Sequence, residues 1–140
     1  MYQFLDRAIW EIDEPFRFLL GAARTWVEHG RSGRCSCAAL TAGFAARSAP
    51  LAVRDFNMAM AVLDNEALGS MRFAPRRTIA IGEDEARLMT LFAAALVADR
   101  GQVRRIAATL VEDAAAAPLA TAVEWVAQHL RHGVAVEDKR

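Results

Sequence analysis

The stretch EDEARLMTLFAAALVADRG, residues 83–101, decides the fold class of this chain. Its first three residues are acidic, which suits the positive N-terminal end of a helix. A helix that is apolar all round is usually buried all round. The positions away from its main apolar stripe, none of them strongly polar, are Thr90, Ala93, Ala94 and Val97. We therefore expect a helix that ends at Gly101 and lies at the centre of a bundle or in an oligomer interface. Alanine on the surface, where it costs a helix little, is the alternative.

Apolar residues recur at helical spacing in further segments on both sides of this stretch. Capping residues, glycines and prolines mark where these helices start and stop. The chain is thus predicted to be an all-α single domain, residues 1–140, of six or seven short helices with a frayed tail at 134–140. The expected helical segments run from 4 to 12, 13 to 30, near 36 to before 50, 53 to about 69, 83 to 101, 103 to 111 and 118 to 133.

One segment, Met71–Ile81, does not follow the helical period. Residues 77–81 alternate roughly as a strand would, with Ile79 and Ile81 on one side. A single short strand is not stable alone. We expect either an extended loop packed on the helices, which is the favoured interpretation, or a strand that pairs with its copy in a dimer.

The composition is that of an ordinary globular protein, and the balance of charges argues against nucleic acid or an acidic membrane as a partner. Apolar residues make up 54% of the 140 residues and charged residues 24%, which excludes a disordered chain. Basic and acidic residues balance at 17 each, so no overall field favours nucleic acid or an acidic membrane. The longest apolar run is about half of the roughly 20 residues that cross a bilayer. With no signal-peptide pattern at the start, the expected location is cytoplasmic.

The loop after the second predicted helix contains the residues best suited to metal or redox chemistry. His29, Cys35 and Cys37 offer the nitrogen and sulfur ligands that zinc prefers, and His129 or His132 would supply a fourth ligand. Nearby arginines and a helix start would favour thiolate, as a redox sensor requires. The plainer interpretation is two buried free thiols, because free cysteines behave as small hydrophobes. A bridge across one intervening residue would be strained.

Arginine accounts for sixteen of the seventeen basic residues, and three arginines gather in the irregular segment. Arg72, Arg76 and Arg77 are a candidate site for an anion, because the guanidinium fork suits phosphate and carboxylate. The acidic residues 83–85 that follow them offer the alternative of internal neutralisation.

No motif of nucleophilic or metal-dependent catalysis is present in the sequence, and no catalytic or cofactor-binding residue is assigned. Zinc is the one cofactor considered. The sequence predicts a non-enzymatic interaction or regulatory module, with a metal-binding or redox-sensing protein and an enzyme of uncommon type as alternatives. A protein partner fits the first class. A homodimer is expected because the apolar helix at 83–101, Trp10 and Trp125 exceed what one small bundle covers.

Short motifs also give the chain a family resemblance. The sequences LGAAR ending in HG at 29–30, APL at 49–51, APR at 74–76 and DEARL at 84–88 resemble a family of small helical bacterial proteins classed as a domain of unknown function. The likeness covers residues 15–95. It implies a helical fold and carries no activity.

Overall fold

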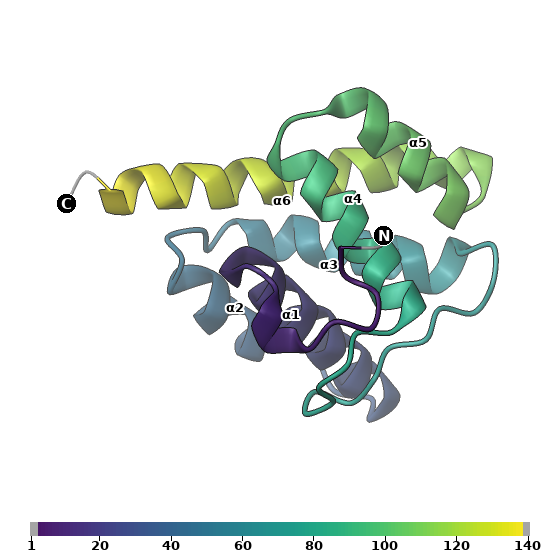
Figure 1. Ribbon diagram of the computed structural model, residues 1–140, viewed down its shortest axis with the longest axis horizontal. Coiled ribbons are helices and arrows are strands. Elements are labelled where there is room, and N and C mark those ends of the chain that lie inside the picture. Colours follow the sequence, from purple (N-terminus) through teal and green to yellow (C-terminus); the bar gives the residue numbers. More distant parts are fainter. Residues whose placement is uncertain (1–2, 139–140) are drawn as a thin grey trace.

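The computed structural model describes the backbone of residues 3–138 and the side chains of residues 3–133. Over this range the chain is all-α and contains no β-strand, as predicted. Figure 1 shows α6 lying lengthwise beside α4 and α5, with α1, α2 and α3 packed together beneath. The elements are the 3-10 helix η1 (Ile9–Glu11) and the α-helices α1 (Glu14–Arg31), α2 (Cys37–Ala45), α3 (Ala52–Glu66), α4 (Glu83–Leu96), α5 (Arg100–Leu110) and α6 (Asp113–Asp138).

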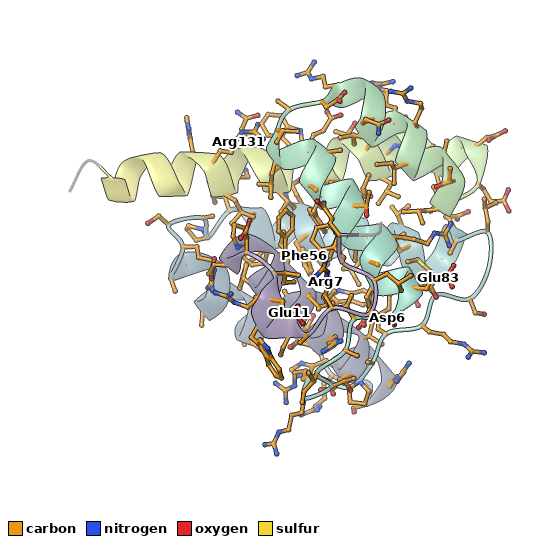
Figure 2. All side chains as sticks on the ribbon, in the orientation of Figure 1. Asp6, Arg7, Glu11, Phe56, Glu83 and Arg131 are labelled. Carbon is orange, nitrogen blue, oxygen red and sulfur yellow. The ribbon has the colours of Figure 1, made fainter. Side chains whose placement is uncertain are left out.

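Helix α4 is the central helix of the domain. Leu88, Met89, Leu91 and Phe92 are fully buried, and the helix packs against α1, α5 and α6. A row of aromatic rings extends from this core through α3 and α2 to α1, formed by Phe92, Phe56, Phe44 and Phe18. Figure 2 shows Phe56 in the interior between the helices. The apolar helix predicted from residues 83–101 is therefore covered within one chain.

The predicted end of this helix at Gly101 is wrong. Helix α4 stops at Leu96, and Ala98 adopts a positive φ of 57° that turns the chain. The carboxylate of Asp99 then accepts a hydrogen bond from the Gln102 amide at 3.2 Å and caps α5. Gly101 lies inside α5. The sequence separated the two helices but placed the boundary too late, because Gly101 was taken as the stop and the turn at residues 97–99 contains no glycine.

The first predicted helix, residues 4–12, is also wrong. These residues form turns and the short helix η1, and part of the segment is extended against residues 79–81. The Ile9 amide donates to the Ile79 carbonyl at 2.9 Å, and the Ile81 amide donates to the Arg7 carbonyl at 3.0 Å. Backbone bonds between distant segments thus replace the local bonds of a helix.

The same contacts settle the character of the predicted interruption at 71–81. It is an extended loop packed on the helices, as favoured, and its one isolated bridge joins Ala80 to Ala8 of the same chain. Ile79 and Ile81, predicted to lie on one side, have different surroundings: Ile81 is buried and Ile79 is 52% exposed.

Helix α6 continues past both residues predicted to bound it, Pro118 and Gly133. A Cβ atom at position 133 would lie 2.2 Å from the Arg47 carbonyl oxygen, so this glycine permits close packing on the end of α2 and does not stop the helix. The predicted frayed tail, 134–140, is described only as backbone, helical to Asp138; residues 139–140 lie outside the described residues. None of the helices described is long and apolar enough to cross a membrane.

Candidate functional site

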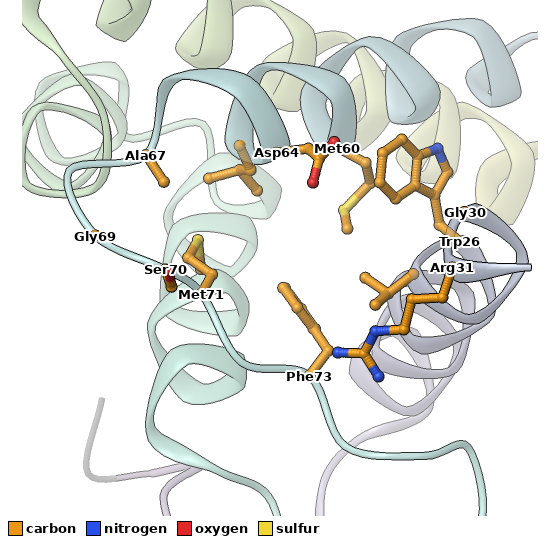
Figure 3. A pocket seen from close by; sticks show the side chains of 12 residues that line it. Trp26, Gly30, Arg31, Met60, Asp64, Ala67, Gly69, Ser70, Met71 and Phe73 are labelled. Atoms are coloured by element: carbon orange, nitrogen blue, oxygen red, sulfur yellow. The ribbon is translucent and has the colours of Figure 1, made fainter. Parts of the chain in front are cut away.

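A cavity of about 660 Å³ opens between the end of α1, the end of α3 and the segment at 69–73. Its surface is about half polar and half apolar, and Met60, Leu63 and Phe73 are buried apolar side chains at its floor. Figure 3 shows Trp26 and Met60 on one side and Met71 on the other. The full lining is Trp26, Val27, Gly30, Arg31, Met60, Leu63, Asp64, Ala67, Gly69, Ser70, Met71 and Phe73.

Helical spacing brings these side chains to one place. On α1 the lining residues are separated by one, three and one positions, and on α3 by three and one, so each set occupies one face of its helix. Helix α3 ends at Glu66, and the residues that follow it, from Ala67 to Phe73, border the opening of the cavity. The Leu68 amide is bonded to the Leu110 carbonyl at 3.0 Å, which fixes where this segment begins.

A buried ion pair between Arg24 of α1 and Glu85 of α4 fixes the backbone of residues 74–80, which follows the lining segment in the chain. The Arg24 Nε atom lies 2.6 Å from Glu85 Oε2, and both side chains are 1% exposed. Arg24 also donates to the carbonyls of Thr78 at 2.7 Å and Ala80 at 3.1 Å. The Ala74 amide in turn donates to Glu85 Oε2 at 3.1 Å. A buried charge pair is tolerated where its remaining donors and acceptors are satisfied, and these bonds provide that.

Sequence reasoning missed this pair. Arg24 lies on the edge of the apolar stripe of α1, and Glu85 had been assigned to the helix N-terminus, where an acid needs no further explanation. Only the packing of α1 on α4 shows that the two side chains meet.

The opening of the cavity carries one cation and one anion. Figure 3 places the Arg31 guanidinium beside Phe73 and the Asp64 carboxylate on a different side of the cavity. Both side chains are exposed. The Trp26 indole donates to Asn57 Oδ1 at 2.7 Å, which fixes the ring that forms part of the wall.

The arginine cluster predicted to bind an anion is spread along the outside of the segment. Arg76 pairs with Glu28 of α1, with Nε 2.9 Å from Oε2, while Arg72 and Arg77 are exposed. The Arg76 backbone amide is the main cause that holds the pKa of Glu28 below its ordinary value. The expected alternative, neutralisation of the cluster by residues 83–85, is wrong for the side chains, because Glu85 binds Arg24 and Asp84 binds Arg87. Anion binding by the cluster stays a prediction.

Both cysteines are exposed free thiols, which corrects the expectation of burial. The Cys37 amide donates to Cys35 Sγ at 3.4 Å. A hydrogen bond from the Cys37 side chain is the main cause that lowers the pKa of Cys35, and the same contact raises the pKa of Cys37. His29 turns Nδ1 toward the Cys35 carbonyl oxygen, at 3.4 Å. Among the described side chains, no three His, Cys, Asp or Glu residues are grouped to hold a metal ion. Zinc binding by His29, Cys35 and Cys37 stays a prediction.

A second cavity, of about 650 Å³, lies where α2, α3 and α6 meet. Cys37, Leu51, Asp55, Trp125 and His129 are among its lining residues. His129 Nε2 lies 3.8 Å from Asp55 Oδ2, and its ring contacts Trp125. Of the two histidines considered as an additional metal ligand, His129 thus faces a carboxylate and His132 is exposed.

Comparison of the chain with protein families, with curated proteins and with solved structures found no match. The resemblance to a family of small helical bacterial proteins stays a prediction.

Proposed function

We propose that the protein is a non-enzymatic interaction module that binds a small amphipathic anion in the cavity between α1, α3 and residues 69–73. The observation that carries this proposal is the combination of the apolar side chains Met60, Leu63 and Phe73 at the floor with Arg31 and Asp64 at the opening. Ligand cavities of this size typically bind through apolar surface and use a few polar groups to orient the ligand. We place the module in the cytoplasm, as the sequence leads us to expect.

The charges around the opening favour an anionic group over a cationic one. Arg31 is accompanied by the exposed Arg34, Arg72 and Arg77 on the neighbouring loops, whereas the nearby Glu28 is already paired with Arg76. Arg31 is the cation among the residues that line the cavity, and an anionic head placed beside it gains an attractive partner. Asp64 faces the same opening and disfavours a second negative group. The ligand class is therefore a molecule with an apolar body and a single anionic head.

Trp26 provides a direct test, because it lines the cavity. In a Trp10→Phe/Trp125→Phe background Trp26 is the only tryptophan, and titration with decanoate should change its emission saturably. Decanol, with the same body and no charge, should bind more weakly. Arg31→Gln should weaken decanoate binding about fivefold, the effect of an exposed charge pair of about 1 kcal/mol. Asp64→Asn should strengthen it. Equal binding of decanoate by all three proteins, or no saturable change, would contradict the proposal.

We also propose a homodimer that covers the exposed apolar side chains of Leu51 and Trp125 and leaves Cys37, which also lines the second cavity, open to solvent. Leu51 is 72% exposed and Trp125 is 47% exposed, and both border that cavity. Light scattering at high concentration should give twice the 15.3 kDa mass of one chain, and Leu51→Asp should reduce it to one. Ala94 does not serve this test: it packs against the core of one chain, so Ala94→Glu should unfold the protein.

A further inference from the structure

The loop between α1 and α2 brings two exposed thiols together, separate from the amphipathic cavity. Ser36, between the cysteines, is buried and has φ −86° and ψ −3°, which turns the chain. This turn places Cys35 Sγ 3.4 Å from the Cys37 amide. The two sulfur atoms therefore belong to one compact turn whose central side chain is anchored and whose outer side chains meet solvent.

We propose that Cys35 and Cys37 form a thiol–disulfide exchange site that takes small disulfides as its substrate, with Cys35 as the attacking residue and Cys37 as the resolving residue. Cys35 is the better nucleophile, because contacts from Cys37 lower its pKa. Cys37 stays protonated at a pH where Cys35 begins to ionise, because the neighbouring sulfur raises its pKa. A reactive cysteine needs thiolate character and access, and Cys35 has both.

The reaction proceeds in two exchange steps. The Cys35 thiolate attacks one sulfur of the small disulfide, whose S–S bond breaks and releases a thiolate that takes up a proton. Cys37 then loses its proton, and its sulfur attacks the Cys35 sulfur of the mixed disulfide, releasing the second small thiol. Two electrons and two protons thus pass from the cysteine pair to the small disulfide, which becomes two thiols.

A bridge across a single intervening residue makes this exchange reversible. Such a short loop strains the disulfide, and a strained, exposed disulfide is readily reduced. Ser36 is the N-cap residue of α2 and is buried, so closing the bridge must be accommodated at the start of that helix. The site is therefore suited to reversible oxidation and unsuited to a permanent structural bridge.

Intact-mass spectrometry of the full chain after incubation with glutathione disulfide tests the proposal. The unaltered protein should lose the mass of two hydrogen atoms, keep no glutathione and regain both thiols on treatment with dithiothreitol. Cys37→Ser should retain one glutathione, because the resolving thiol is missing. Cys35→Ser should form its adduct more slowly than Cys37→Ser does, because Cys37→Ser keeps the backbone amide that donates to the Cys35 sulfur and favours its thiolate. The double variant Cys35→Ser/Cys37→Ser should not change in mass.

Several results would overturn the proposal. They are a stable glutathione adduct on the unaltered protein, no reaction, a disulfide between two chains, or equal rates for the two single variants. Circular dichroism of each variant shows whether the helices are retained. Because both thiols are exposed, serine at either position should leave the fold intact, so that a change in reactivity reports chemistry.

Discussion

Two segments of the chain interrupt the helices, and they are held in opposite ways. Residues 67–82, between α3 and α4, are fixed from inside by the buried Arg24–Glu85 pair. Residues 32–36, between α1 and α2, are exposed except for Ser36. The first segment can therefore form the wall of a cavity, and the second leaves its thiols open to solvent. The comparison teaches that the partners of a loop, and not its composition, determine what it can do.

Breaking the buried pair should have the largest effect. Glu85→Gln leaves the Arg24 charge buried without its partner, which should lower the free energy of unfolding by roughly 3–5 kcal/mol. Urea unfolding measures the loss. The matched control is Glu83→Gln, an exposed acid in the same helical turn. Equal midpoints for the two variants would show that the pair does not hold the segment.

Replacing both members of the pair distinguishes its effect on global stability from its effect on the backbone of residues 74–80. Arg24→Met/Glu85→Leu removes both charges and should recover most of the stability lost in Glu85→Gln. The backbone groups of residues 74–80 would still lack their partners, so hydrogen exchange of these amides should remain faster than in the unaltered protein. Protection equal to that of the unaltered protein would mean that the wall is held by other contacts.

Another prediction concerns the contact between α6 and the chain just after α2, where Gly133 lies against Arg47. Gly133→Ala places a methyl group against the Arg47 carbonyl and should cost about 1–3 kcal/mol through overpacking. Gly21→Ala is the matched control, since no atom lies within 4 Å of the added Cβ and the substitution favours the helix. It should raise stability by about 0.5–1 kcal/mol. Thermal unfolding of the two variants measures the difference, and a neutral Gly133→Ala would contradict close packing there.

The two segments also show how far sequence reasoning extends. Periodicity predicted the buried helix that starts at residue 83, although not its end, and the helices around Leu20, Phe44 and Phe56, because each of these buries one continuous stripe. The exposed thiols and the close approach at Gly133 were interpreted incorrectly, since both depend on which surface another helix covers. The cavity was not predictable either. Its lining comes from two helices and a loop, and the loop continues into backbone that bonds the buried Arg24, a contact visible only once α1 and α4 are packed together.

A third prediction contrasts the buried arginine with an exposed one on the same segment. Arg76 lies 58% exposed and pairs with Glu28, so Arg76→Ala should lower the thermal midpoint far less than Glu85→Gln does. The folded protein has a lowered Glu28 pKa, so the stabilisation is present above the ordinary glutamate pKa and disappears as the pH falls through the lowered one. Thermal midpoints at neutral and strongly acidic pH measure this loss. Arg76→Ala keeps the backbone amide that bonds Glu28 but loses the guanidinium, so this loss should be smaller in it than in the unaltered protein. Arg77→Ala keeps both contacts, so its loss at acidic pH should equal that of the unaltered protein.

The smallest effect is expected in the thiol loop itself. Cys35→Ser/Cys37→Ser replaces two exposed sulfur atoms with oxygen, and the serine hydroxyl at position 35 can still accept the bond from the amide at position 37. The urea midpoint should therefore not change measurably, whereas labelling by N-ethylmaleimide should be lost completely. A destabilisation as large as that of Gly133→Ala would mean that the thiols hold the start of α2. In that case both interrupting segments would stabilise the fold, and the two thiols would have a structural role that the comparison of the two segments does not assign to them.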